Sequence, residues 1–335
     1  MKNKVKRIVC LAAAVLMVLS AAVGCSSSKQ VDFKLVDRTF VSDEIKYFGN
    51  YGYRVYDDGC VAIVEYSGNE AQINIPETIE GGRVVALGAE AFSGNTDLQS
   101  VRLSSVEIIG DYAFYGCTAL SDITFGKGLW SVGMGAFERT PWLSAQTEEF
   151  VVVGDGVLIK YQGDSKYVTI PAGIRHISNA FEMNEALLGV ELGDQVCTLG
   201  TNAFAMCLAL RYVEFGQNLK LIGAGAFDSC EQLSSVAIPD SVERIEDYAF
   251  NYCSNMSMVK IGKSVKTIGA RAFYSCIRLK VIDMPVSVES VAPYAFGECL
   301  ALTIVFYGGS EAQFAALELD GTNYLIKDVE KIYAQ

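Results

Sequence analysis

The most regular feature of the chain is a pattern of apolar positions that repeats about every 23 residues. The generic unit is L-x-x-[VI]-x-[IL]-P-x-x-V-x-x-I-G-x-x-A-F-x-x-C, and the unit from Leu233 to Cys253 matches it except that Glu246 stands at the Gly position. An Ala-Phe pair marks each unit, and the last six phenylalanines are 23 residues apart. A fixed period of this size indicates a solenoid, in which each unit stacks on the next. The nine marking residues are Phe92, Phe114, Phe137, Phe181, Phe204, Phe227, Phe250, Phe273 and Phe296.

Each part of the unit predicts a local structure. The segment L-x-x-V-x-I alternates apolar and polar positions and is rich in β-branched residues, so it predicts a short strand that Pro or Gly ends. The segment V-x-x-I-G is expected to turn the chain back. The Ala-Phe segment is expected to form a short helical or 3₁₀ turn on the outer side. A single unit cannot bury its phenylalanine and aliphatic side chains alone, so the units must stack.

Two segments interrupt the repeat and predict β-hairpins. Residues 53–56 and 60–66 flank Asp57-Asp58-Gly59, and Phe150–Val153 and Val157–Tyr161 flank Gly154-Asp155-Gly156. β-rich runs around such turns are typical of hairpins. The first hairpin is expected to cap the N-terminal edge of the core. The second either protrudes from the solenoid or replaces part of one unit.

The hydrophobic strand Phe150–Val153 has two interpretations. It either contacts a partner or packs on the neighbouring unit, and packing is favoured because exposed flat strands promote aggregation. After Gly309 the repeat stops, residues 310–319 have helical spacing, and residues 323–333 predict one more strand.

The repeat resembles the leucine-rich repeat, in particular the BspA-type repeat of bacterial surface proteins. The residues that carry the resemblance are Ile238-Pro239, Ile268-Gly269 and Ala272-Phe273-Tyr-Ser-Cys276, and it extends from about residue 51 to the C-terminus. The resemblance implies an α/β leucine-rich-repeat solenoid, dominated by strands, with two hairpin modules and a C-terminal cap. It also implies adhesion or other protein–protein binding outside a bacterial cell.

The position three residues after each phenylalanine forms a predicted structural ladder. Leucine-rich repeats place Asn or Cys there to satisfy backbone groups, and a buried thiol fits the same space. Stacked positions would hold their Cβ atoms about 4.8 Å apart, whereas a disulfide requires about 3.8 Å. A row of thiols also does not converge on a metal ion. We therefore expect free thiols at this ladder, which comprises Asn95, Cys117, Thr140, Asn184, Cys207, Cys230, Cys253, Cys276 and Cys299.

The N-terminus has the features of an export signal. Four cations precede an apolar run from Ile8 to Val23, which is shorter than the roughly 20 residues of a membrane span. The run ends in Ala22-Val23-Gly24-Cys25 and resembles a bacterial lipobox, in which Cys25 would be lipidated. Ala22 stands where that pattern prefers Leu, so cleavage after Gly24 without lipidation remains an alternative. Either route predicts an exported protein, and lipidation predicts anchoring at the outer face of the cell membrane.

These features divide the chain into five segments. They are a signal peptide (1–24), a lipid anchor with a linker or N-terminal segment (25–50), the first hairpin with the first repeat block (51–147), the second hairpin with the main block (148–309), and the C-terminal cap (310–335).

Charge narrows the choice of partners. The net charge is −12, and removing the four cations of residues 1–24 makes it −16, from 23 basic and 39 acidic residues. An acidic protein repels phosphate, which argues against nucleic acid as a partner.

No catalytic, metal or cofactor motif stands out from the repeats. The only histidine, His176, occupies an outward position of the returning segment and is expected at the surface. The Asp57-Asp58-Gly59 turn lacks the further acids of a calcium loop. We therefore expect a protein that is not an enzyme.

If the L-x-x-V-x-I strands form the concave sheet, their outward residues become more apolar toward the C-terminus. Contiguous exposed apolar surface marks partner sites, so an extracellular or envelope protein is the expected partner. The alternatives are an exported glycan- or small-ligand-binding protein or hydrolase, and a passive envelope component. The candidate ligand-binding residues are Tyr212, Met258, Val281, Ile304 and Phe306.

Overall fold

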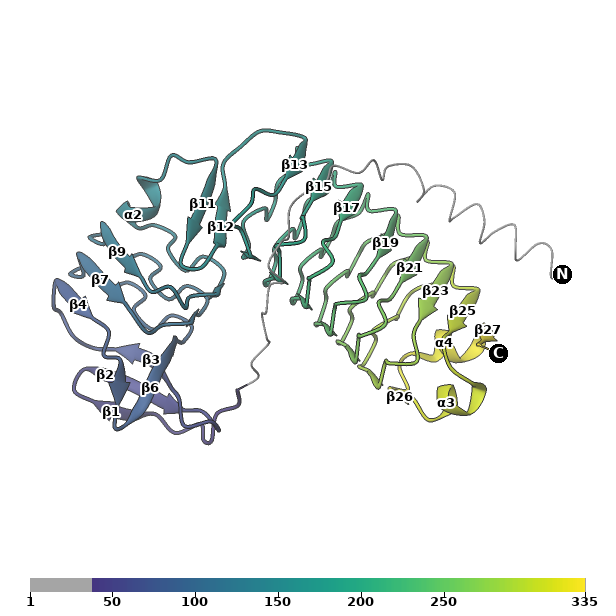
Figure 1. Ribbon diagram of the computed structural model, residues 1–335, viewed down its shortest axis with the longest axis horizontal. Helices are drawn as coiled ribbons and strands as arrows, with labels where there is room; N and C mark the ends of the chain where they lie inside the picture. Colours follow the sequence, from purple (N-terminus) through teal and green to yellow (C-terminus); the bar gives the residue numbers. More distant parts are fainter. Residues whose placement is uncertain (1–37, 335) are drawn as a thin grey trace, which may run out of the picture. The chain divides into compact units, whose positions relative to one another are not determined.

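The computed structural model describes residues 38–334, which form a solenoid dominated by strands (Figure 1). This confirms the predicted fold class: turns of about 23 residues stack in register, and helices are few and short. The predicted signal peptide and the lipidation site Cys25 lie outside the described residues.

The L-x-x-V-x-I segments form parallel strands, as predicted, and we call their succession the long-strand row. It consists of three sheets, within which each strand pairs with the same strand of the next unit. The sheets are β4 (Gln72–Asn74), β7 (Ser100–Leu103) and β9 (Asp122–Phe125); β13 (Tyr167–Thr169), β15 (Gly189–Glu191) and β17 (Tyr212–Glu214); and β19 (Ser235–Ala237), β21 (Met258–Lys260), β23 (Val281–Met284), β25 (Ile304–Tyr307) and β27 (Glu330–Tyr333).

The V-x-x-I-G segments were predicted only to turn the chain, but the structure gives each a strand of its own. These two-residue strands pair in parallel with their counterparts in neighbouring units, and we call their succession the short-strand row. The row is divided between two sheets, one in each block, and the nine-stranded sheet of the main block is the longest sheet within the described residues. Stacking of the units brings equivalent backbone groups to the spacing of hydrogen-bonded strands, so that even two residues suffice for pairing. The strands are β8 (Ile108–Ile109), β10 (Ser131–Val132), β14 (His176–Ile177), β16 (Thr198–Leu199), β18 (Leu221–Ile222), β20 (Arg244–Ile245), β22 (Thr267–Ile268), β24 (Ser290–Val291) and β26 (Glu318–Leu319), with β6 (Gly82–Leu87) in the first block.

The Ala-Phe segments form turns and no continuous α- or 3₁₀-helix, and we call their succession the turn row. Only every second N–H makes the bond to the carbonyl three residues earlier that is typical of a 3₁₀ turn, as Asn251 N does to Tyr248 O at 3.0 Å. In an α-helix each backbone N–H donates to the carbonyl four residues earlier. Here every second N–H donates instead to a carbonyl of the next unit. Tyr248 N donates to Ala270 O at 2.9 Å, and Phe250 N donates to Ala272 O at 2.7 Å. A third set of hydrogen bonds between units therefore replaces a helix.

The repeat phenylalanines stack in the core. Within the main block, neighbouring rings from Phe181 to Phe296 lie 4.9 to 5.2 Å apart between centroids, and their planes are within 13° of parallel. A hairpin tyrosine starts each stack of rings. The ring centroid of Tyr66 lies 4.9 Å from that of Phe92, and the ring centroid of Tyr161 lies 4.8 Å from that of Phe181.

Both predicted hairpins are present. β2 (Tyr51–Val55) pairs with β3 (Val61–Tyr66), and β11 (Phe150–Val153) pairs with β12 (Val157–Tyr161). Within the segment 25–50, β1 (Lys46–Phe48) pairs with β2 and so adds a strand to the first module. The first module also contains β5 (Thr78–Ile79), which pairs with β6.

The second hairpin replaces part of a unit, which was one of the two predicted alternatives. Strand β12 pairs in parallel with β14 and so begins the short-strand row of the main block. Val153 and Val157 pack into the first hydrophobic core, whereas Leu158 and Tyr161 pack into the second. Before this hairpin lies the helix α2 (Pro141–Ser144), whose N-cap is Thr140; the Thr140 hydroxyl accepts from Leu143 N at 3.1 Å.

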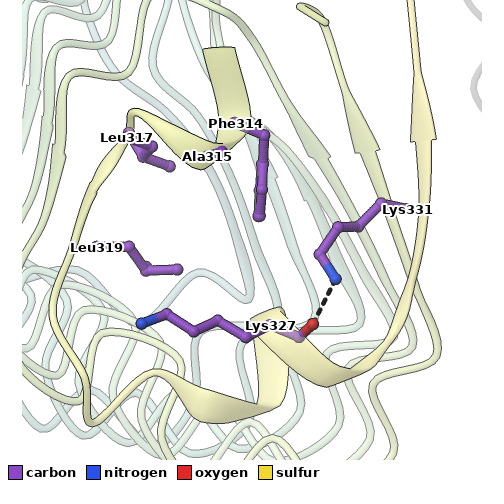
Figure 2. Close-up of a pocket in the computed structure, with 6 residues that line it drawn as sticks. All are labelled: Phe314, Ala315, Leu317, Leu319, Lys327 and Lys331. Atoms are coloured by element: carbon purple, nitrogen blue, oxygen red, sulfur yellow. Dashed lines mark hydrogen bonds between the residues drawn. The ribbon is translucent and has the colours of Figure 1, made fainter. Parts of the chain in front are cut away.

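The C-terminal cap differs from its prediction in one element. Residues 323–333 were expected to form one strand, but the structure places the helix α4 (Tyr324–Asp328) before β27. The helix α3 (Glu311–Ala315) agrees with the helical spacing of residues 310–319. Between α3, β26 and α4 lies a cavity of about 260 Å³, where Lys331 Nζ donates to Lys327 O (Figure 2).

The cap also ends the turn row. Tyr294 N and Phe296 N stand where other units donate to the next unit, and here they donate to Thr322 Oγ1 at 2.7 Å and Asn323 Oδ1 at 3.0 Å. Side-chain oxygens thus replace the carbonyls of a missing unit, which satisfies buried backbone donors.

Candidate functional site

The structure brings four of the five predicted ligand-binding residues together on the long-strand row. Met258, Val281 and Ile304 lie on neighbouring strands in direct register, and Phe306 lies two residues further along β25. All four side chains are half-buried. They form an apolar stripe that remains accessible, which we call the strand stripe.

Tyr212 lies apart from the strand stripe. It belongs to β17, in a separate sheet, and its hydroxyl donates to Glu214. Tyr212 and Tyr167 flank Gly189 in register, where an added Cβ would meet both rings. The five predicted residues therefore occupy two different sheets.

The ladder positions show three kinds of hydrogen bonding, one for each residue type. Each ladder cysteine donates from Sγ to the carbonyl of the phenylalanine one unit earlier, for example Cys253 to Phe227 O at 3.2 Å. The first unit after each hairpin has Asn instead, and Asn95 Oδ1 and Asn184 Oδ1 accept from Leu98 N and Leu187 N. Thr140, at the end of the first block, donates from its hydroxyl to Phe137 O in its own unit at 2.7 Å. We infer that Cys fits positions where the phenylalanine carbonyl of a preceding unit is available to accept its thiol hydrogen bond. Asn instead accepts from backbone N–H groups of its own turn where a hairpin precedes the unit.

Burial makes the ladder thiols poor nucleophiles. It raises the pKa of Cys117 to about 11 and that of Cys207 to about 12, and it raises the pKa of Cys253 well above its ordinary value. Cys60 is the cysteine of the described region that is only half-buried. Since the thiolate is the reactive form, the structure separates one accessible thiol from seven buried ones.

We expect this difference to appear in thiol titration of the non-reduced 26–335 protein. The folded protein should react rapidly at one thiol, Cys60, and the unfolded protein at eight. Cys60→Ser should remove the rapid phase. A count well below eight after unfolding would show that disulfides exist and would contradict free ladder thiols.

The turn row carries side chains in an unusual backbone conformation. In eight of the nine units the residue two before the phenylalanine has positive φ, and in all nine so does the residue two after it. Tyr248, Arg271 and Tyr294 have φ values of 60°, 54° and 56°. This region costs a residue other than glycine about 1 to 2 kcal/mol. Bulky side chains there point to a role that outweighs the cost.

These residues form a cluster that we call the tyrosine–arginine cluster. The guanidinium of Arg271 lies over the rings of Tyr248, Tyr274 and Tyr294, at 5.8, 5.5 and 5.6 Å from their centroids. Tyr252 and Tyr274 meet edge to face at 6.0 Å. Tyr248, Tyr252 and Tyr294 are 40 to 50% exposed, so the cluster offers aromatic surface to solvent.

A smaller version occurs in the first block. Arg139 lies 5.0 Å from the ring centroid of Tyr115, which meets Tyr112 edge to face at 5.6 Å. The tyrosine–arginine cluster was not predicted from the sequence. The signal in the sequence was the recurrence of Tyr and Arg at the variable positions beside Ala-Phe. A helical interpretation of these segments would have placed those side chains on different faces of a helix.

His176 corrects the prediction of a surface histidine. The side chain is only 2% exposed, its Nδ1 lies 2.9 Å from Thr198 Oγ1, and its ring lies 6.0 Å from that of Trp130. The outward position of the returning segment is covered here by the adjoining first block. Desolvation, assisted by Arg175, lowers the pKa of His176 to about 3.

Within residues 38–334, no group of three or more His, Cys, Asp or Glu side chains is arranged to hold a metal ion. The helices of this region are all too short or too polar to cross a membrane.

The stacked strands, the buried phenylalanines and the Asn/Cys ladder define a leucine-rich-repeat solenoid. Residues 85–183 and 175–303 match the family described as BspA type leucine rich repeat region, in six copies. Because these ranges cover more than half of the chain, the protein belongs to this family.

The chain is also similar to solved bacterial structures. A leucine rich cell surface protein from Faecalibacterium prausnitzii A2-165 is 22% identical over 84% of this chain and 99% of its own, with a TM-score of 0.41. The pneumococcal vaccine antigen PcpA is 16% identical over 87% and 99%, with a TM-score of 0.47. The leucine rich repeat protein of T. pallidum is 25% identical over 70% and 91%, with a TM-score of 0.29. No curated protein matches the chain.

Proposed function

We propose that this protein is exported, lipid-anchored through Cys25 at the bacterial cell surface, and binds an extracellular or envelope protein through its solenoid surface. The observation that carries the binding role is the tyrosine–arginine cluster. Tyr and Arg are the residue types that dominate binding energy at protein interfaces. Family membership and the acidic charge agree with a non-catalytic protein that does not bind nucleic acid.

The binding role is tested with the 26–335 protein on a panel of immobilised, purified extracellular-matrix and envelope proteins. We expect Arg271→Gly and Tyr294→Gly to weaken binding about tenfold or more. Stability should change by no more than about 1 kcal/mol, because relief of backbone strain offsets the lost cation–π contacts. Met206→Gly is the matched control, since Met206 is 43% exposed with φ of 59° but lies outside the cluster.

The strand stripe is a second candidate surface for the same function. The paired substitutions Met258→Glu and Ile304→Glu place carboxylates on it without touching the turn row. If these weaken binding and the Arg271 and Tyr294 variants do not, the strand stripe is the binding surface. Binding to glycans but to no protein would favour the alternative function, and no binding at all would favour a passive envelope component.

Localisation is tested separately by metabolic labelling with a radioactive fatty acid. The full chain expressed in a bacterial host should incorporate label, and Cys25→Ala should abolish it. Export without label would instead support cleavage after Gly24.

A further inference from the structure

The two hairpin modules are equivalent residue by residue. Tyr66 and Tyr161 both start a phenylalanine stack, and each pairs across its hairpin with an aromatic residue, Tyr51 or Phe150. In both hairpins the pairing register shifts at the same place, after the second residue pair counted from the aromatic pair. The shift lies between Gly52 and Tyr53 in the first hairpin and between residues 151 and 152 in the second. Phe150 thus corresponds to Tyr51, and Val152 corresponds to Tyr53.

The outer edge of the first hairpin is covered by its own chain. Strand β1 pairs along β2, with Phe48 opposite Tyr51 and Lys46 opposite Tyr53. In the second module, within residues 38–334, β11 pairs with β12 alone and ends the nine-stranded sheet (Figure 1). The second hairpin thus lacks the strand that covers the first.

The free edge of β11 presents backbone groups to an added strand. Gln162 N donates to Glu149 O at 2.8 Å, so Glu149 occupies a hydrogen-bonded position of the hairpin. Alternation in antiparallel pairs then directs the N–H and C=O of Phe150 to the other edge. The first module shows the same arrangement, because Ser67 N donates to Asn50 O and the next residue, Tyr51, pairs with β1.

A groove of about 530 Å³ is lined in part by the side chains of β11. Phe150, Val152 and residues 171–174 provide its apolar lining, and Val152 is 42% exposed. In the first module the residue corresponding to Val152 is Tyr53, which is buried and donates to Glu80 at 2.6 Å, next to β5. The main block has no counterpart of β5, which leaves its groove open.

The groove carries acidic side chains at one end. Glu148 and Glu149 line it, both residues are exposed, and no Lys or Arg lines it. This charge favours a cation on the occupant and disfavours a second copy of this chain, whose net charge is −12.

We propose that the outer edge of β11 binds an extended segment of a different protein by strand addition. The segment pairs antiparallel with Phe150 and Val152, places an apolar side chain in the groove, and places a Lys or Arg beside Glu148 and Glu149. Main-chain hydrogen bonds supply affinity in this binding mode, and side-chain pockets supply specificity. This site goes beyond the proposed function, because it is separate from the tyrosine–arginine cluster and does not depend on it.

The test uses a short capped peptide that contains Ile45-Lys46-Tyr47-Phe48 flanked by lysines, because that sequence covers the equivalent edge in the first module. We expect fluorescence anisotropy to show saturable binding to the 26–335 protein. Hydrogen exchange should show protection of the Phe150 and Val152 amides when the peptide is bound.

Two variants address the site differently. Val152→Pro removes the outward N–H, which an edge strand tolerates, and should weaken peptide binding about tenfold. The paired change Glu148→Lys and Glu149→Lys alters only exposed residues and should weaken it similarly through charge. Val286→Pro, at another exposed valine, is the matched control.

The proposal is overturned if the peptide does not bind, if protection appears elsewhere, or if both variants bind like the parent. Concentration-dependent self-association that protects the same amides would also overturn it, since the occupant would then be a second copy. Because the peptide assay involves no matrix protein, its failure is distinguishable from failure of the proposed function.

Discussion

Phe250→Ala should lower the free energy of unfolding of the 26–335 protein by about 3 to 5 kcal/mol. The ring is fully buried and stacks between Phe227 and Phe273, at 5.1 Å from each. Its loss leaves a cavity in the middle of a continuous stack, and the neighbouring units cannot close it without breaking their backbone pairing. Urea denaturation followed by circular dichroism measures the change.

Tyr252→Ala is the control for this substitution, because Tyr252 belongs to the same unit but is 50% exposed. Its cost should stay near or below about 1 kcal/mol. If Phe250→Ala costs no more than Tyr252→Ala, the phenylalanine stack does not hold the units together.

Acidification from about pH 7.5 to pH 4 should destabilise the protein by about 3 kcal/mol through His176 alone. The folded pKa of about 3 lies below the ordinary value of 6.5, because the buried imidazole resists charging. The unfolded chain therefore binds a proton first as the pH falls. The stabilisation is complete above about pH 6.5 and is lost progressively toward pH 3.

The paired change His176→Leu and Thr198→Val isolates this effect. It removes the titrating group together with its 2.9 Å hydrogen-bond partner, so that no polar atom of the pair is left buried alone. The variant should lose about 3 kcal/mol less than the parent between the two pH values, measured by urea denaturation. An equal loss in both proteins would show that His176 charges freely in the folded state and is not buried.

The parts of the fold that follow from local pattern were predictable. Alternation predicted the long-strand row, and the turns at Gly59 and Gly154 predicted the hairpins. The short-strand row was missed because two residues carry no periodicity; their pairing depends on the next unit. The turn row was misread as helical for the same reason, since its donors bond to a neighbour 22 residues away, as Tyr248 N does with Ala270 O.

The candidate sites likewise include residues that the repeat pattern could predict and residues that it could not. Register alone brought Met258, Val281 and Ile304 together, because parallel strands of equal units align. The tyrosine–arginine cluster brings together Tyr248, Arg271 and Tyr294 from three successive units, and each of these residues has a positive φ that the sequence does not reveal. His176 was misplaced because a repeat pattern cannot show that another block covers one of its outward positions.

The sequence by itself determined that equivalent residues stack, since a unit that buries one phenylalanine has no core without neighbours. Only the tertiary structure decided what stacking demands of each position. Gly262 illustrates this: it was interpreted as a strand end, yet an added Cβ would lie 1.9 Å from Pro239 O of the preceding unit. Tertiary structure likewise decided that β1 covers one hairpin and leaves the other open, because the edges of strands depend on what lies beside them.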